Sequence, residues 1–289
     1  MPVVPEYPNG LTLPILQELL AEADPPFSAS IYPSDATLTS FYQALKSLEK
    51  IKYTTSCEAV AEIDDVDTLC SKYGGKKPYV SEQHPYPICP HDNLPLVFFF
   101  QLCVNDIPEE IRPASLLSGS ILQLFKCRAL DGSCSAVTYA GGLEDPEYFC
   151  RIVNPLVETA STAYPLVPDP IETLSCKKVT GYIPRLCFPN YVEFSQHFPE
   201  FSDEVWLDLV FDSLHDKFEF DGDGIGGYPQ WVQSPDYRSC PICGATCEFV
   251  YQIEGEDLFQ FMFGDCGNCQ ILVCPEHGDQ SIQMVWASG

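Results

Sequence analysis

The sequence contains an internal repeat, which predicts two related folding units. Each copy opens with a glycine pair, reaches a Cys-Pro dipeptide 13 or 14 residues later, and closes an apolar run with a glutamine 12 residues after that cysteine. The markers are Gly74-Gly75, Cys89 and Gln101 in one copy, and Gly226-Gly227, Cys240 and Gln252 in the other. Two tandem units explain this agreement better than chance.

Short apolar runs separated by glycine, proline and asparagine predict β-rich structure after Cys70. Before that point, the apolar spacing in Leu11–Glu22 and Ser40–Lys50 predicts two short helices. A proline-rich stretch from Pro155 to Pro170 marks a boundary. We therefore expect three parts: an N-terminal helical segment over 1–71, a first β repeat over 72–170 and a second β repeat with a zinc knuckle over 171–289.

The chain is strongly acidic, with a formal net charge of −26 over 289 residues. This charge disfavours direct binding to nucleic acid or to an anionic membrane surface. Hydrophobic residues make up 45% of the chain, which is enough for a folded core. The segment Tyr191–Gly289 holds 18 acidic residues against two basic ones, Lys217 and Arg238. An acidic face of this kind favours a basic protein partner.

The 15 cysteines point to metal binding rather than to disulfides. The count is odd, and the first residues, Met1–Pro8, lack the basic and apolar regions of a secretory signal. No apolar run approaches the roughly 18 residues that a membrane-spanning helix needs. We expect a reducing, cytoplasmic location, where clustered cysteines usually bind metal.

Cys240 and Cys243 form a Cys-Pro-x-Cys knuckle, which needs a second pair of ligands to close a tetrahedral zinc site. Cys274 with His277 follows after 30 intervening residues, and the alternative second pair, Cys266 with Cys269, after 22. The dipeptide Cys274-Pro275 repeats the Cys-Pro sequence of the first knuckle and ends an apolar run. We therefore prefer Cys274 and His277 as the second pair of ligands. Cys266 and Cys269 remain an open alternative.

The first repeat carries a degraded counterpart of this knuckle. A second metal site there would draw its ligands from Cys89, His91, Asp92, Cys127 and Cys134. Simple buried thiols are the equally weighted alternative.

A zinc ion with four protein ligands has no open position for substrate, so its expected role is structural. No nucleophile elbow, Walker loop or calcium loop occurs, and no small-molecule substrate is identified. We therefore favour a non-catalytic, zinc-stabilised protein-binding module, such as a chaperone, assembly factor or neutralising factor. The alternatives are an enzyme with a pocket between the two repeats, using residues such as Asp265, Trp231 or Gln233, and a structural subunit of a larger assembly.

Several of these motifs together carry a family resemblance. The run Gly226-Gly-Tyr-Pro-Gln-Trp-Val-Gln233 and the pairing of Cys240-Pro-x-Cys with Cys274-Pro-x-His resemble the YwqG-like family of proteins of unknown function, over about Lys72 to Trp286. The resemblance implies an α+β fold of duplicated antiparallel β-sheet units and no established activity. In that family the turn at Gly264 generally lacks cysteines, which supports His277 as a ligand, and Asp92 departs from the pattern by replacing a knuckle cysteine. The chain is also distantly similar to the programmed-cell-death-two-like chaperones, which shield a basic ribosomal protein.

Overall fold

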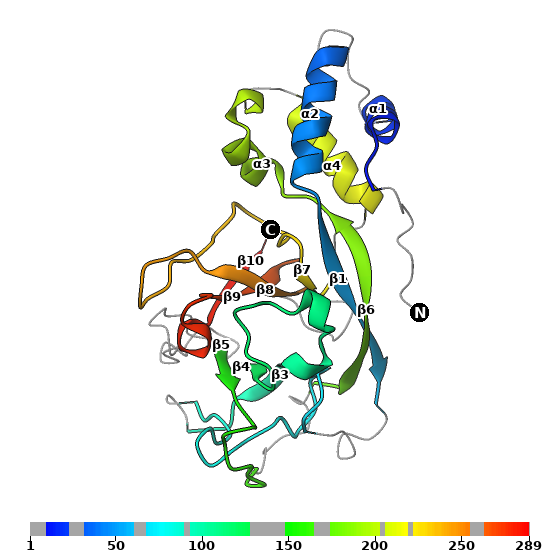
Figure 1. The fold of residues 1–289 in the computed structure, drawn as a ribbon. Coiled ribbons are helices and arrows are strands. Elements are labelled where there is room, and N and C mark those ends of the chain that lie inside the picture. The colour runs from blue at the N-terminus through cyan, green and yellow to red at the C-terminus, as the bar shows by residue number, and fades with distance from the viewer. Residues whose placement is uncertain are drawn as a thin grey trace.

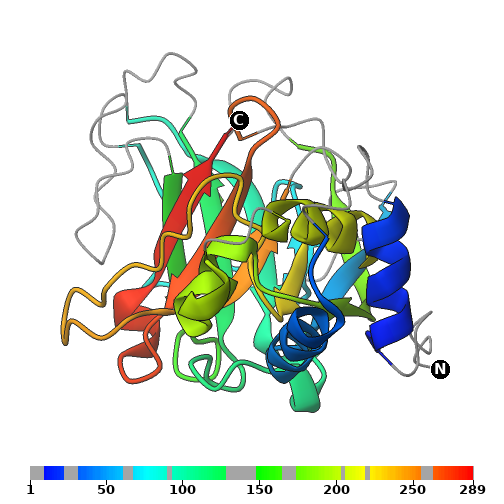
Figure 2. The same ribbon diagram turned by 90° about the horizontal axis from the view of Figure 1, so that it is seen from above.

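The computed structural model describes residues 10–22, 32–60, 68–89, 93–127, 148–164, 174–202, 206–218, 222–254 and 263–288. Within these ranges the chain forms four α-helices and one antiparallel sheet of 10 strands (Figures 1 and 2). The strands are β1 (Lys50–Ala59), β2 (Lys72–Tyr73), β3 (Val97–Cys103), β4 (Ile121–Lys126), β5 (Tyr148–Val153), β6 (Lys177–Cys187), β7 (Gly224–Gly226), β8 (Glu248–Ile253), β9 (Asn268–Val273) and β10 (Gln283–Ala287).

The strand order is β10-β9-β8-β7-β1-β6-β2-β3-β4-β5, so the sheet has matching halves on either side of the central pair. β1 pairs with β7, which follows β6 in the sequence, and β6 pairs with β2, which follows β1. Each long central strand therefore pairs with the short strand that follows the other long strand. The expected segment 1–71 contributes more than helices, because β1 lies within it and forms the centre of the sheet. The boundaries 1–71, 72–170 and 171–289 stay a prediction.

β1 and β6 form a long antiparallel ribbon that starts at Lys50, paired with Cys187. The helices gather at this end of the ribbon (Figure 1). They are α1 (Leu13–Glu22), α2 (Asp35–Ser47), α3 (Tyr191–His197) and α4 (Leu207–Phe218). Phe41 of α2 meets Phe194 and Trp206 edge to face at centroid distances of 5.1 and 4.9 Å, an arrangement that aromatic rings favour. The helices thus have their own apolar core, separate from that of the sheet.

The first predicted helix is confirmed, but the second is shifted towards the N-terminus. It begins at Asp35 rather than Ser40, because the Ser34 side chain accepts a hydrogen bond from the Thr37 backbone N–H and caps it. It ends at Ser47, and the residues from Lys50 onwards pair with β6 instead of continuing the helix. In the described ranges, no helix has both the length and the apolar character needed to cross a bilayer.

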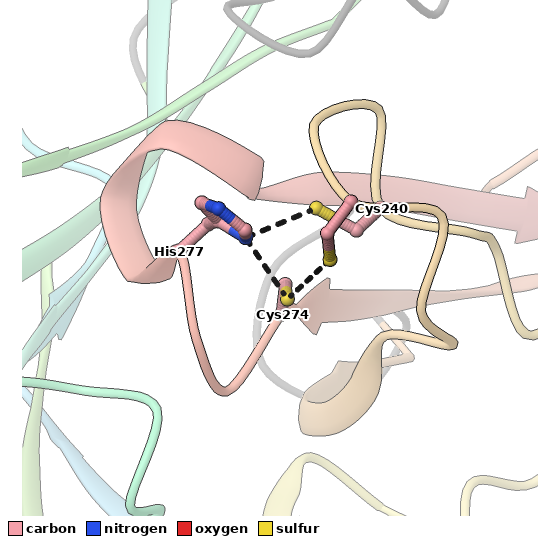
Figure 3. Close-up of side chains that lie close together, drawn as sticks. Cys240, Cys274 and His277 are labelled. Carbon is pink, nitrogen blue, oxygen red and sulfur yellow. Dashed lines mark hydrogen bonds between the residues drawn. The ribbon is translucent and has the colours of Figure 1, made fainter.

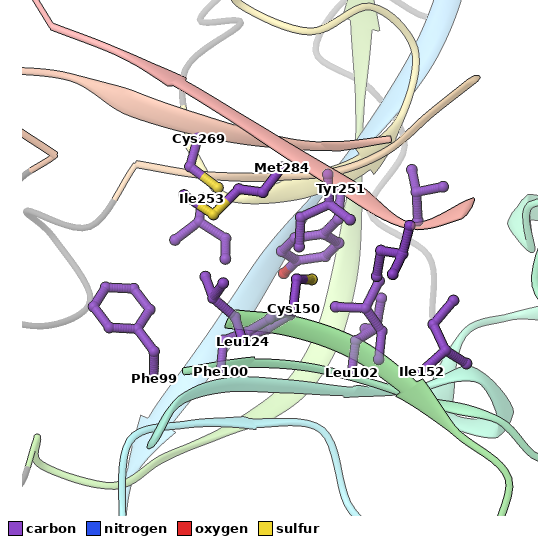
Figure 4. Close-up of a cluster of buried hydrophobic side chains, with 14 of the residues drawn as sticks. Phe99, Phe100, Leu102, Leu124, Cys150, Ile152, Tyr251, Ile253, Cys269 and Met284 are labelled. Carbon is purple, nitrogen blue, oxygen red and sulfur yellow. The ribbon is translucent and has the colours of Figure 1, made fainter. Parts of the chain in front are cut away.

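The main core lies between the two halves of the sheet, whose side chains point toward one another (Figure 4). Phe100 of β3 stacks on Tyr251 of β8 with ring centroids 4.7 Å apart. At the outer strands, Tyr148 of β5 lies 6.3 Å from Trp286 of β10. Since β5 and β10 are the two edges of the sheet, their approach makes the fold a nearly closed barrel.

Candidate metal centre and the adjoining pocket

Four predicted ligands, Cys240, Cys243, Cys274 and His277, come together at one end of the second half of the sheet. One donor atom from each lies within 4.8 Å of all the others. The His277 Nδ1 atom lies 3.7 Å from Cys240 Sγ and 3.6 Å from Cys274 Sγ (Figure 3). The Sγ atoms of Cys243 and Cys274 are 3.8 Å apart. The cluster can therefore hold a metal ion.

These separations fit a tetrahedral ion. Zinc–sulfur bonds of about 2.3 Å and zinc–nitrogen bonds of about 2.0 Å place two sulfurs about 3.8 Å apart and a sulfur and a nitrogen about 3.5 Å apart. The distances from Cys274 Sγ to Cys243 Sγ and to His277 Nδ1, 3.8 and 3.6 Å, match both values. The three donor pairs at 3.6 to 3.8 Å thus lie near the separations of a tetrahedral site, and the others lie within 4.8 Å.

Two equivalent turns present the ligands. The Gly244 N–H donates to the Cys240 carbonyl, and the Gly278 N–H donates to the Cys274 carbonyl, both at 2.9 Å. Gly244 and Gly278 have φ angles of 77° and 49°, in the left-handed region that glycine adopts without strain. Sequence reasoning missed both glycines, although the common pattern Cys-Pro-x-ligand-Gly is visible in each knuckle.

The first knuckle favours a thiolate at Cys240. Desolvation works against ionisation, but the backbone N–H groups of Cys243 and Ile242 outweigh it and lower the pKa of Cys240 to about 7. Cys247 lies beside the cluster without belonging to it. Burial raises the pKa of the Cys247 thiol to about 11, and its sulfur accepts a hydrogen bond from Gln283 Nε2 at 3.2 Å. Metal ligands bind as thiolates, a form that the lowered pKa of Cys240 favours. Cys247 is set apart by its position, because its sulfur is not among the clustered donor atoms.

The alternative pair, Cys266 and Cys269, lies elsewhere. Cys266 is exposed in a turn with a φ angle of 52°. Cys269 is fully buried on β9 and packs in the main core between the two sheet halves (Figure 4). Neither residue joins the four clustered ligands in the described part of the chain.

The first half keeps the backbone of a knuckle. The Asn93 N–H donates to the Cys89 carbonyl at 2.9 Å, and Asn93 has a φ angle of 58°, so it stands where Gly244 does in the second half. The Sγ atoms of Cys89 and Cys127 lie 3.6 Å apart, and both thiols are buried. The other three candidate ligands, His91, Asp92 and Cys134, lie outside the described residues. A metal site in this half stays a prediction.

A pair of buried glutamines, the glutamine clamp, positions the loop that leads to the first knuckle, at Cys240. The Gln252 side-chain oxygen accepts a hydrogen bond from the Gln230 backbone N–H at 2.7 Å, and Gln270 Nε2 donates to the Gln230 carbonyl at 3.0 Å. Gln252 and Gln270 are opposite each other on β8 and β9 and are fully or nearly fully buried. These two hydrogen bonds hold the backbone of Gln230 in place and so position the neighbouring Trp231.

A pocket of about 600 Å³ lies between α3, α4 and the loop 228–234. Trp231 lines this pocket and also packs against the apolar cluster that contains Cys240 and Cys274. Its ring meets that of Tyr237 edge to face at 5.1 Å, and the Tyr237 hydroxyl donates to Glu193 Oε1 of α3 at 2.7 Å. The metal centre and the pocket therefore share a wall.

A second buried polar group lies at the centre of the molecule. The hydroxyls of Tyr73 and Tyr251 are 2.7 Å apart, and Asp223 lies close to both tyrosines. Burial raises the pKa of Asp223 to about 7, although the Glu254 backbone N–H donates to its Oδ1. Asp223 is only 5% exposed and does not line the pocket. Its shifted pKa follows from burial in the core rather than from a place in a cleft.

The fold and its cysteine–histidine centre belong to a chain whose residues 71–279 match the model of a domain of unknown function (DUF1963). This match covers most of the chain, and the protein is therefore a member of that family. An uncharacterised protein, YpfL, from Salmonella typhimurium is 32% identical over 187 residues, which are 65% of this chain and 36% of the relative. The chain thus spans about a third of the length of the curated relative it matches.

Proposed function

We propose that this protein is a non-catalytic, zinc-stabilised module that binds a basic protein partner on its acidic surface. The observation that carries the proposal is the cluster of four possible protein ligands, with donor atoms within 4.8 Å of one another, in a chain of net charge −26. Membership of a family of unknown function does not indicate an activity for this protein. The proposal therefore depends on the chemistry of these residues.

The donor set favours zinc. Three thiolates and one imidazole are soft and borderline ligands, which bind zinc in preference to calcium or magnesium. Because Cys240, Cys243, Cys274 and His277 supply all four bonds, no position is left for water or substrate. Such an ion would join β8, β9 and the knuckle turns and so contribute directly to the free energy of folding.

The features that would support catalysis are weak. The alternative hypothesis expects a pocket between the two repeats, but all residues that line the described pocket lie within the segment 171–289. Desolvation by burial raises the pKa of Cys57, near the central polar group, to about 12, and that of Cys187, in the pocket wall, as well. Protonated thiols are poor nucleophiles. An activity at this pocket would need a group that the geometry does not single out.

The acidic surface supports a basic partner. The segment from Tyr191 to Gly289, with its 18 acidic and two basic residues, includes α3, α4 and the metal-binding turns. Complementary charge raises the association rate and disfavours acidic competitors. The resemblance expected from the sequence, to chaperones of a basic ribosomal protein, would agree with this kind of partner, and we propose a role as chaperone, assembly factor or neutralising factor. A cytoplasmic location suits the described cysteines, which form no disulfides among themselves.

A gene duplication accounts for the matching halves. The bulge beside Phe100 in β3 has its counterpart beside Tyr251 in β8, and each bulge precedes a paired glutamine in the register. We propose that the first half arose from the same ancestral unit and that Asp92 replaced one of its knuckle cysteines.

Co-purification from the native cells tests the proposed function. We expect a basic protein that remains bound at low ionic strength and is released by added salt, because surface charge pairs are screened. Recovery of the protein alone, at low ionic strength and with its metal intact, would contradict the proposal.

A further inference from the structure

The pocket beside the metal centre has a composition that suits a cation. Five of its lining residues are aromatic, and the carboxylates among the described lining residues are those of Asp208 and Asp212 on α4. Asp208 and Asp212 stand four residues apart on that helix, both exposed, and therefore lie on one helical face at the mouth of the pocket. No lysine or arginine stands among the described lining residues. Lys50 Nζ lies 4.0 Å from the centroid of the Tyr228 ring, so Trp231 and Phe211 offer the ring faces for a further cation. A cation entering the pocket thus meets carboxylates at the rim and ring faces further in.

The inner wall offers aromatic faces and an amide. Tyr228 and Trp231 come from the loop fixed by the glutamine clamp, and Phe211 comes from α4. Gln230 contacts the His215 ring nitrogen Nε2 through one end of its side-chain amide. In either orientation of that amide, its other polar atom is buried without a partner among the described residues. An incoming polar group would satisfy it.

We propose that this pocket receives an arginine side chain from a basic segment of the protein partner, an inference that rests on the proposed function. The planar guanidinium stacks on aromatic faces and pairs with carboxylates through two hydrogen bonds, which an ammonium group cannot do. The guanidinium stacks on the ring of Trp231 and presents its N–H groups to Asp208 and Asp212, while the arginine stem extends out of the pocket towards the rest of the segment. A volume of about 600 Å³ is large enough to admit neighbouring residues of the segment as well.

A peptide-binding experiment tests this inference on the full chain. The probe is a fluorescent, blocked heptapeptide with two arginines, and its partner peptide carries citrulline, which keeps the shape but loses the charge. The double variant Asp208→Asn with Asp212→Asn removes the carboxylates at the pocket. The matched control, Glu109→Gln with Glu110→Gln, removes the same charge from the exposed turn Glu109–Ile111 in the other half.

We expect the arginine peptide to bind the unaltered protein and the control equally, and the pocket variant at least about tenfold more weakly, because two charge-assisted hydrogen bonds are lost. The citrulline peptide should bind none of them. Unchanged metal content and near-ultraviolet circular dichroism would show that the pocket variant is folded.

Two other outcomes separate this inference from the proposed function. Equal affinity of the arginine peptide for the two double variants would overturn the pocket as the binding site, because the peptide would then bind elsewhere on the acidic surface. If poly-L-arginine also failed to bind the unaltered protein, the proposed function would fall with it. Binding of Nα-acetyl-arginine amide as tight as that of the peptide would assign the pocket to a small cationic molecule and overturn the protein segment as its occupant.

Discussion

Gln101 and Gln252 stand at equivalent positions in the two halves of the sheet, and the side chain of each binds the backbone of one loop residue. Gln101 Oε1 accepts a hydrogen bond from the Tyr79 N–H at 2.8 Å, and Gln252 Oε1 accepts one from the Gln230 N–H at 2.7 Å, each across 22 residues of sequence. In both halves, the glutamine opposite on the next strand binds the carbonyl of the clamped residue. The clamp is thus a shared device that fixes the loop after the glycine pair.

Replacing the buried Gln252 with leucine should destabilise the protein by roughly 1–3 kcal/mol, because the part-buried Gln230 N–H would lose its acceptor. Urea unfolding measures this change. Gln17→Leu, at an exposed position of α1, is the control and should shift stability by less than about 0.5 kcal/mol. Equal effects of the two substitutions would contradict the role of the clamp.

The knuckle turn predicts which residues position 244 tolerates. Asn93 adopts a φ angle of 58° at the equivalent place in the first half, so Gly244→Asn should keep the turn and the bound metal. Gly244→Val should lower metal affinity, since a β-branched residue is strained at the φ angle of 77° found there. Space is not the obstacle, because nothing lies within 4 Å of an added Cβ. Competition with a chelating dye compares the two variants, and equal affinities would refute this account of the turn.

Asp223 should make stability fall as pH rises. Its pKa is about 7 in the folded protein against an ordinary value of 3.8, so between these values the folded state binds a proton that the unfolded state has lost. This contribution is fully present below about pH 4 and is lost as pH rises through 7. Each pH unit in the window costs about 1.4 kcal/mol.

Asp223→Asn removes this titration. From pH 5 to pH 8, the free energy of unfolding of the unaltered protein should therefore fall by roughly 2–3 kcal/mol more than that of the variant. Urea unfolding at the two pH values measures the difference, with Glu109→Gln as a carboxylate control that should follow the unaltered protein. Parallel pH profiles for Asp223→Asn and the unaltered protein would show that Asp223 is ionised in the folded state.

Metal removal should reach the pocket through their shared wall. Trp231 packs against the cluster of Cys240 and Cys274, so chelation should change its fluorescence and weaken the binding of the arginine peptide. Trp231→Phe should abolish most of the fluorescence change, since Trp206 and Trp286 pack in other clusters. A change that persists undiminished in Trp231→Phe would place the response elsewhere.

The local patterns predicted the strands and the residues that cluster at Cys240, and metal binding by that cluster stays a prediction. Glycine pairs, apolar runs and Cys-Pro dipeptides are short-range signals, and the repeated dipeptide favours Cys274 over Cys266 as a member of the cluster. The pairing of Lys50 with Cys187 could not be predicted in this way, because no local signal joins strands so distant in sequence. Apolar spacing instead extended the second helix into the beginning of β1.

The pocket was harder to foresee than the metal centre. Its wall combines the end of β6, two helices and the loop 228–234, and only the tertiary fold brings these together. The sequence did contain one signal, since Trp231 and Gln233 were candidate polar residues and both line the pocket. The described lining residues all lie within the segment 171–289, and an enzyme pocket between the two repeats, with Asp265 among its residues, stays a prediction.

Elemental analysis of the purified protein tests the metal centre most directly. The protein should contain zinc, Cys274→Ser should contain one zinc ion fewer per chain, and Cys266→Ser should retain the full amount, because only Cys274 lies with Cys240, Cys243 and His277. An unaltered protein free of zinc, or a loss of zinc from Cys266→Ser but not from Cys274→Ser, would contradict the account.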